Sequence, residues 1–306
     1  MLESEENRYH KPVMLGECIE GLNIDPDGIY IDVTFGGGGH SKAILDKLGN
    51  GHLYAFDQDQ DAKANAQEIE NSSFTFIEGN FRYIKRYLKA LRITEIDGIL
   101  ADLGISSHQI DDASRGFSTR FDADLDMRMD QSARITAKDV INDYSQDELH
   151  RILGMYGEVR NAKTLAAAIV SARINKAIDT VEDFKGILAK YAKRGKENRY
   201  YAQVFQAIRI EVNEEMKVLE EFLQQSVELL KPQGRLVVMS YHSLEDRLVK
   251  NYIAKGKSSG EVEKDFYGNV LKPLNPVNRK PITASDEELK ENNRARSAKL
   301  RIAEKI

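Results

Sequence analysis

Four consecutive glycines, Gly36–Gly39, join a predicted strand to a predicted helix in the first part of the chain. Glycines at such a junction let the backbone approach a ligand closely, and the start of the following helix offers unpaired N–H groups to an anion. Asp57 ends the next predicted strand, where a carboxylate can accept both hydroxyls of a ribose. Together these residues predict a site for a nucleoside-containing cofactor.

The residues alone leave two cofactors open. A dinucleotide fingerprint reads Gly-x-Gly-x-x-Gly/Ala; Gly36 and Gly38 fit its first two positions, but the third falls on Ser41. S-adenosylmethionine carries a carboxylate, an ammonium and a sulfonium, which suit a glycine loop and an acid at the end of the fourth strand. Asp102 is that acid. Either an NAD-linked dehydrogenase or a methyltransferase is compatible with this pattern.

The chain has one cysteine, Cys18, which excludes a disulfide framework and a cysteine-based zinc site within a single chain. Methylation at carbon 5 of a pyrimidine generally uses a thiolate that adds to the ring. Cys18 lies in a predicted amphipathic helix beside Ile19 and Leu22, so we expect it in the core. Transfer to nitrogen or oxygen is therefore favoured over transfer to carbon.

Asp122, Asp124 and Asp126 have the spacing that begins an EF-hand loop. Met127 stands at the sixth position, where that loop needs glycine, and Ala133 stands at the twelfth, where it needs glutamate. The segment does not predict a calcium site, and we predict no metal site in this chain.

Alternating strands and helices surround the glycine loop and the two aspartates. The predicted strands are 29–34, 52–57, 74–77 and 96–102, and the predicted helices are 41–48, 61–69 and 83–91. This alternation predicts a parallel sheet with right-handed crossovers.

About 130 residues separate Asp102 from the next strong strand, 236–241, although a parallel crossover needs only about a dozen. This interval shows helical patterns at 162–178 and 181–192 and no convincing strand. We therefore predict a methyltransferase or dinucleotide-type α/β domain of residues 1–111 and 211–306, interrupted by a helical domain of residues 112–210.

The final third of the chain resumes the sheet pattern. An apolar stripe from Val212 to Leu230 predicts a helix that Lys231–Gly234, with a proline and a glycine, should end. A helix is predicted at 243–253, a loop with weak strand character at 251–286, and an edge strand at 299–303.

The composition is that of an ordinary globular protein: 41% of the 306 residues are hydrophobic and 30% are charged. The acidic start of the chain is no signal peptide, and no apolar run reaches the ~20 residues of a membrane span. With a single cysteine, the cytoplasm is the expected compartment. A formal net charge of −5 argues against nucleic-acid binding by bulk charge alone.

Two local clusters of basic residues are candidate sites for binding a nucleic acid. Basic and aromatic side chains together suit phosphate contact and base stacking, although a solvated helix face with core aromatics explains them equally well. The first cluster holds Lys185, Lys190, Lys193, Arg194, Lys196, Arg199 and Arg209 with Tyr191, Tyr200, Tyr201 and Phe205 interleaved, and the second holds Arg294, Arg296, Lys299 and Arg301.

Five segments are specific in combination. They read Thr-Phe-Gly-Gly-Gly-Gly-His-Ser (34–41), Asp-Gly-Ile-Leu-Ala-Asp-Leu-Gly-Ile-Ser-Ser (97–107), Leu-Asp-Met-Arg-Met-Asp (125–130), Ser-Tyr-His-Ser-Leu-Glu-Asp-Arg (240–247) and Asn-Arg-Ala-Arg-Ser-Ala-Lys-Leu-Arg (293–301). In this order they resemble the bacterial RsmH (MraW) family of methyltransferases, from Tyr9 to the C-terminus. The resemblance implies a class I, Rossmann-like α/β sheet with an inserted all-helical domain, which would recognise RNA.

The resemblance also implies an activity: transfer of a methyl group from S-adenosylmethionine to N4 of a cytidine in 16S rRNA of the small ribosomal subunit. The cofactor contacts it implies fall on Gly38, Gly39, His40, Asp57, Phe81, Asp102 and Gln109. His108 stands where the family usually has proline, and residues 118–124 also diverge. An enzyme of this kind would have no membrane partner, and a homodimer is one of the states left open.

Methylation of an exocyclic amine needs an acceptor that orients the N–H groups and draws charge from the nitrogen. Asp102 is the candidate for this catalytic role, in addition to its implied cofactor contact. His242 closes the strand at 236–241, at the sheet edge where α/β sites gather, and is the candidate substrate-binding residue. Besides the dehydrogenase, a non-catalytic RNA-binding ribosome assembly factor remains as an alternative.

Overall fold

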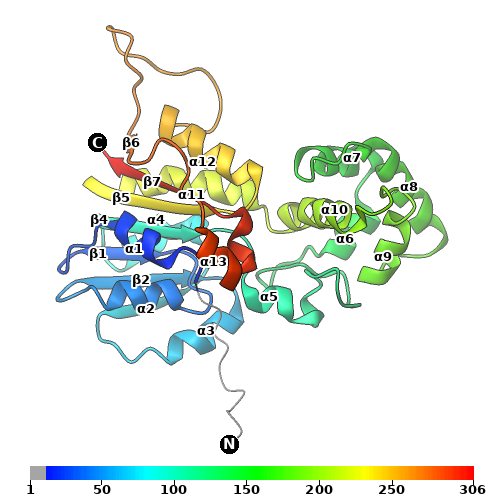
Figure 1. Cartoon of the computed structure of the whole chain (residues 1–306), viewed down its shortest axis with the longest axis horizontal. Coiled ribbons are helices and arrows are strands. Elements are labelled where there is room, and N and C mark those ends of the chain that lie inside the picture. The colour runs from blue at the N-terminus through cyan, green and yellow to red at the C-terminus, as the bar shows by residue number, and fades with distance from the viewer. Residues whose placement is uncertain (1–11) are drawn as a thin grey trace, which may run out of the picture. The chain divides into compact units, whose positions relative to one another are not determined.

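The computed structural model describes residues 12–306 (Figure 1). The chain forms two compact units, and each is described by itself. The first joins the described residues up to Gly104 with Lys217–Ile306, and the second is Ile105–Met216. The boundaries expected from the sequence fell after residues 111 and 210. The acidic start of the chain, for which no signal peptide is predicted, lies outside the described residues.

A seven-stranded sheet of order β3-β2-β1-β4-β5-β7-β6 forms the centre of the first unit. Its strands are β1 (Ile29–Asp32), β2 (His52–Asp57), β3 (Phe74–Glu78), β4 (Ile96–Asp102), β5 (Leu230–Ser240), β6 (Leu274–Pro276) and β7 (Lys299–Lys305). β1 to β5 pair in parallel, whereas β7 runs antiparallel to β5 and β6. Helices cover both faces of the sheet (Figure 1). The predicted Rossmann-like α/β class, with four parallel strands between residues 29 and 103, is confirmed.

The predicted edge position of the last strand is wrong. β7 lies between β5 and β6, and β6 forms the edge. β6 has only three residues, two of them exposed, and it ends at Pro276, a residue type that sheets tolerate at their edges. So short a segment shows no alternating pattern, which explains why the sequence indicated only weak strand character there.

β5 begins earlier than the predicted strand at 236–241. The helix before it, α11 (Glu215–Leu229), ends where expected, but Lys231–Gly234 lie within the strand instead of forming a turn. Gln233 has a φ of +68°, and the pairing of β5 with β4 shifts register at this point. Such a bulge inserts extra residues into a strand without ending it.

Helix α1 (Leu15–Leu22) packs on the sheet together with α2 (Gly39–Leu45). Cys18 is fully buried in α1, as expected, and burial raises the pKa of its thiol well above the usual value. The thiol therefore stays neutral and does not serve as a nucleophile. The other helices of this unit are α3 (Gln60–Gln67), η1 (Phe81–Tyr83), α4 (Ile84–Ala90), α12 (Ser243–Lys255), α13 (Asp286–Glu291) and η3 (Asn293–Ser297).

The second unit is helical around a core of its own. Its helices are α5 (Ser107–Asp111), η2 (Ala113–Arg115), α6 (Ala137–Asp143), α7 (Gln146–Met155), α8 (Ala162–Asn175), α9 (Val181–Leu188) and α10 (Glu197–Val212). The predicted helices at 162–178 and 181–192 are present but end earlier, at Asn175 and Leu188. In the described part of the chain, no helix has the length and apolar character needed to cross a membrane.

Candidate cofactor site and its surroundings

The glycine loop follows β1 and leads into α2. Gly38 stands directly before the helix with a φ of +75°, and Gly36 has a φ of +50°, a region that residues with side chains rarely adopt. A Cβ atom on Gly39 would lie 2.2 Å from Cγ of Pro12. Gly38 is therefore required by the backbone conformation and Gly39 by the close approach of Pro12, whatever the loop binds.

A carboxylate that the sequence did not single out holds this loop. Asp32, the last residue of β1, is buried, and its Oδ2 accepts a hydrogen bond from Ser41 Oγ at 2.7 Å. Its Oδ1 accepts from the backbone N–H of Thr34 at 3.0 Å. Burial raises the pKa of Asp32, while the nearby His40 and these hydrogen bonds lower it. The sequence pattern that could have predicted Asp32 is an acidic residue at the end of an apolar strand, directly before the glycine loop.

Asp57 ends β2 and is bound by two backbone donors. Its Oδ2 accepts from the N–H of Gly36 at 2.8 Å, and its Oδ1 accepts from the N–H of Asp59 at 2.9 Å. Burial raises the pKa of Asp57 to about 6. Each carboxylate oxygen keeps a second acceptor position, so the group can still receive hydrogen bonds from a diol.

Asp102 ends β4 and has side-chain partners. Its Oδ1 accepts a hydrogen bond from the Tyr241 hydroxyl at 2.7 Å, and its Oδ2 lies 3.9 Å from Nδ1 of His40. Its backbone N–H donates to Thr34 Oγ1 at 2.7 Å. Burial raises the pKa of Asp102 to about 6, although His40 and the Tyr241 hydroxyl both act to lower it. About a quarter of its side chain, 23%, remains exposed.

His40 is buried in the first turn of α2. Its Nε2 lies 3.1 Å from the carbonyl oxygen of Val13. A carbonyl only accepts hydrogen bonds, so Nε2 carries a proton in this contact, while Nδ1 faces Asp102. His40 therefore holds the loop to the segment before α1, and its contact with a cofactor stays a prediction.

These carboxylates lie at the carboxyl ends of their strands, on the same side of the sheet, because β2 and β4 both pair with β1 in parallel. Asp57 and Asp102 thus lie on either side of the glycine loop that follows β1. Parallel α/β sheets bind their ligands beyond the carboxyl ends of the strands. The geometry brings together five of the predicted residues, Gly38, Gly39, His40, Asp57 and Asp102.

Phe81 begins η1, which follows β3 at the same edge of the sheet. Asn80 caps this turn by accepting a hydrogen bond from the N–H of Arg82. The Phe81 ring meets the ring of Phe222 edge to face, with 5.2 Å between the centroids. Phe81 is partly exposed, and the cap and the ring contact hold it in one orientation. Its contact with a cofactor stays a prediction.

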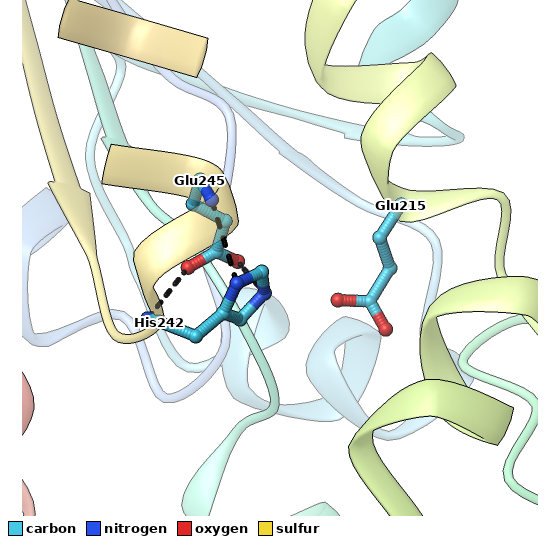
Figure 2. A group of neighbouring side chains, drawn as sticks. All are labelled: Glu215, His242 and Glu245. Carbon is cyan, nitrogen blue, oxygen red and sulfur yellow. Dashed lines mark hydrogen bonds and ion pairs between the residues drawn. The ribbon is translucent and has the colours of Figure 1, made fainter. Parts of the chain in front are cut away.

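His242 occupies the residue before α12, and Figure 2 shows its bonds with Glu245. Nδ1 of His242 accepts from the backbone N–H of Glu245 at 3.4 Å, and Nε2 lies 3.1 Å from Oε1 of the same glutamate. Glu245 Oε2 in turn accepts from the backbone N–H of Tyr241 at 2.9 Å. This reciprocal capping gives His242 a structural role that the sequence did not predict, and its substrate role stays a prediction.

Gln109 belongs to the second unit, where it forms a capping box at the start of α5. Its Oε1 accepts from the N–H of Ser106 at 3.0 Å, and Ser106 Oγ accepts from the N–H of Gln109 at 3.1 Å. Its cofactor contact stays a prediction. His108 lies in the first turn of α5, where backbone N–H groups have no partner within the helix. Either histidine or proline therefore fits at that position.

The first basic cluster divides into paired and exposed members. Lys185 pairs with Glu182, and Arg209 makes two hydrogen bonds to Glu215. Tyr201 and Phe205 are buried in the core of the second unit and so are not available for base stacking. The basic residues with exposed side chains are Lys190, Lys193, Arg194, Lys196 and Arg199, which lie before and within the first turn of α10.

The second basic cluster is partly neutralised. Lys299 and Arg301 both pair with Asp246 of α12, at 3.3 and 2.7 Å. Arg301 is buried and paired at the contact of β7 with α12, so its guanidinium is not available to a polyanion. This leaves the exposed loop before α10 as the stronger candidate for contact with a polyanion.

Comparison with known proteins gives a match along nearly the whole chain. A family model described as the MraW methylase family matches residues 7–306. Among solved structures, an rRNA methylase from Streptococcus thermophilus aligns over 95% of this chain and 93% of its own, with 12% identity and a TM-score of 0.40.

Curated relatives are much more similar. A protein of Cytophaga hutchinsonii is 61% identical over 297 residues, which cover 97% of this chain and 99% of the relative. One from Flavobacterium johnsoniae is 58% identical, covering 97% and 98%, and one from Parabacteroides distasonis is 51% identical, covering 100% of both. Each of the three is named ribosomal RNA small subunit methyltransferase H.

Proposed function

Because this chain belongs to the MraW methylase family, it is a methyltransferase that uses S-adenosylmethionine, and we propose that it methylates N4 of a cytidine in 16S rRNA of the small ribosomal subunit. The observation that carries the proposal is the pair of carboxylates, Asp57 and Asp102, on either side of the glycine loop. The proposed substrate places the reaction in the cytoplasm. Neither the dehydrogenase nor the non-catalytic assembly factor has support among the relatives.

The residues at the sheet edge fit the groups of this cofactor. Asp57 offers free acceptor positions to the two ribose hydroxyls, because backbone donors occupy only one position on each of its oxygens. Asp102, whose Oδ2 has no donor closer than the 3.9 Å contact with His40 among the pairs described, suits an ammonium or an amine N–H.

The reaction is an in-line displacement. The lone pair of N4 forms the new N–C bond, the C–S bond breaks with its electron pair going to sulfur, and the proton that N4 loses passes to the acceptor that orients the amine. When bound, S-adenosylmethionine supplies the electrophilic methyl group. The chain supplies the positions of the reactants, which gains effective concentration, and an acceptor for the amine.

We assign the acceptor role to Asp102. An exocyclic amine is a weak nucleophile because its lone pair is delocalised into the ring. A carboxylate that accepts one N–H bond orients the amine and stabilises the positive charge that develops on nitrogen. Asp102 is partly exposed at the sheet edge and ionised above a pH of about 6, as this role requires.

On the RNA side, we assign phosphate contacts to the exposed basic residues before and within the first turn of α10. Five basic side chains lie within the short stretch from Lys190 to Arg199, with Glu197 as the one acid among them. Such a stretch binds a polyanion locally even though the whole chain is acidic. This assigns recognition of RNA in the small subunit to the second unit.

Methyl transfer to isolated small ribosomal subunits tests the proposal. Subunits from cells that lack the modification would be incubated with the protein and labelled S-adenosylmethionine, followed by digestion to nucleosides. We expect the label in N4-methylcytidine. Label in a 2′-O-methylated or carbon-5-methylated nucleoside would contradict the proposed chemistry, and the absence of transfer to 16S rRNA would contradict the proposed substrate.

The basic stretch has its own test. Replacing Lys193 and Arg194 by glutamate should lower affinity for the small subunit by roughly tenfold or more at low salt, with less effect at high salt. Lys47 and Lys89, exposed lysines of the first unit, provide a charge-matched double variant. Equal losses in both variants would show that net charge, not this stretch, determines binding.

A further inference from the structure

Tyr241 connects the carboxylate that ends β4 with the start of α12. Its hydroxyl donates to Oδ1 of Asp102 at 2.7 Å, across 139 residues of sequence. Its backbone N–H donates to Oε2 of Glu245 at 2.9 Å, and the backbone N–H of Glu245 donates to the His242 side chain. The tyrosine is thus held at the backbone by one glutamate while its ring reaches a candidate site residue.

Gly104 contributes to this arrangement. It follows β4 with a φ of +97°, and an added Cβ there would come within 3.5 Å of Cδ2 of Tyr241. The Tyr241 ring therefore lies beside the backbone at Gly104. An aromatic ring fixed at both ends delivers its hydroxyl to one place with little loss of conformational entropy.

We propose that Tyr241 is a positioning residue for Asp102: its hydroxyl fixes the plane of the carboxylate, so that Oδ2 is directed to the ligand. This inference deepens the proposed function, since it rests on Asp102 acting at the cofactor site. A carboxylate without this donor could rotate about its terminal bond, because such torsions are broad.

The groups that face Asp102 determine whether loss of the Tyr241 hydroxyl raises or lowers the pKa of Asp102. Burial raises its pKa, and the negative charges of Asp32 and Glu245 raise it further. His40 and the Tyr241 hydroxyl lower it, and Cys18 of α1 lies close enough that Asp102 in turn raises the pKa of that thiol. Removing the hydroxyl leaves the raising influences in place, so the pKa of Asp102 must rise.

The hydroxyl itself remains a donor throughout the working pH range. Burial and the adjacent Asp102 raise the pKa of Tyr241 far above its usual value, so the phenol stays protonated. Tyr241 therefore does not contribute to the acid limb of activity, and at saturating cofactor Asp102 does. Loss of the hydrogen bond should move that limb to higher pH.

The test is Tyr241→Phe, which keeps the ring and its packing and removes only the donor. Carboxyl-carbon NMR with labelled aspartate, assigned with Asp102→Asn, would follow the titration of Asp102 directly. We expect its midpoint to rise by roughly one pH unit in Tyr241→Phe, as a hydrogen bond to a charged group predicts. An unchanged midpoint would overturn the inference.

Kinetics would show the consequence. With an RNA substrate, kcat/KM should fall by about threefold at pH 6.5, as a rise of one unit from about 6 implies, and by less at pH 9, where the carboxylate is ionised in both proteins. A loss of the same size at every pH, with a lowered melting temperature, would mean a purely structural role and would also overturn the inference. In Tyr241→Phe/Asp102→Asn, the pH dependence due to this pair should be gone.

Tyr144→Phe is the matched control. The Tyr144 hydroxyl donates to Oε1 of Glu211 at 3.2 Å within the second unit, so this variant also loses a tyrosine–carboxylate bond. It should leave the titration of Asp102 unchanged. The NMR titration needs no substrate, so it tests the role of Tyr241 even if the native protein methylates a different RNA, and the two failures remain distinguishable.

Discussion

Asp57 and Asp102 end two strands that flank β1, and the pKa of each is raised by burial to about 6. Their partners differ. Asp57 is bound by backbone N–H groups of Gly36 and Asp59, both within 21 residues of it, whereas Asp102 is bound by the side chain of Tyr241, 139 residues away.

The difference separates a fixed carboxylate from an adjustable one. Backbone donors are present whatever the side chains are, so the environment of Asp57 is set by the course of the loop. The donor to Asp102 is a side chain and can be changed by one substitution. A group that only holds a cofactor needs constancy, whereas a group that also handles a proton needs a pKa matched to its task.

The largest effect is expected from Asp102→Asn. An amide cannot stabilise positive charge on the attacking nitrogen, so methyl transfer under single-turnover conditions should fall by about 10²–10⁴. Thermal unfolding would serve as the control for folding. A loss confined to cofactor affinity, with the single-turnover rate intact at saturation, would mean that Asp102 only binds the cofactor.

Asp57→Ala should act on binding instead. Removing the acceptor for two ribose hydroxyls should weaken S-adenosylmethionine by roughly 100-fold, as charged hydrogen bonds of about 1.5–3 kcal/mol imply. Calorimetric titration measures this directly. Unchanged affinity would contradict the ribose assignment, and the single-turnover rate at saturating cofactor should be much less affected than in Asp102→Asn.

The raised pKa of Asp102 also has a cost in stability. Its folded pKa of about 6 exceeds the unfolded value of about 3.9, so its favourable contribution is present below pH 4 and is lost as pH rises through 6. The free energy of unfolding of Asp102→Asn, measured relative to the native protein, should therefore be roughly 2 kcal/mol higher at pH 7.5 than at pH 4. Urea unfolding at the two pH values measures it, and an equal change at both would argue against a raised pKa.

The smallest effect is expected from Asp59→Asn. Asparagine keeps the cap of α3, where Asp59 accepts from the N–H of Asp61. The charge of Asp59 contributes to the raised pKa of Asp57, so its removal should move the acid limb of cofactor binding down by a few tenths of a pH unit. Calorimetry between pH 5 and 7 would detect this shift, and a shift upward would contradict the assignment of that limb to Asp57.

Much of the candidate cofactor site was predictable because the sequence patterns that indicate it are local. Apolar runs of strand length predicted β1 to β4 nearly to the residue, and Asp57 and Asp102 stood out as acids at strand ends. The bond from Tyr241 was not predictable, since nothing local relates residues 139 apart. The position of β7 was wrong for the same reason: a strand pattern does not encode which neighbour the strand will pair with.

The capping role of His242 had a local signal that resembles a known pattern. A side chain that accepts at a helix start, followed three residues later by glutamate, is the spacing of a capping box. Histidine in place of serine or threonine hides this pattern, although a neutral imidazole nitrogen accepts a hydrogen bond as well. The role of Asp32 was not predicted for a different reason: its partner Ser41 comes close to it only because the glycine loop turns.

The discontinuity of the first unit affects how the chain reaches its native state. β4 and β5 are adjacent, yet the whole helical unit Ile105–Met216 lies between them in sequence. Closing a flexible loop of that length costs entropy before any contact compensates for it, and non-local pairings of this kind form slowly. The helical unit has its own core, so we expect it to form first and so to reduce the entropic cost of pairing β4 with β5.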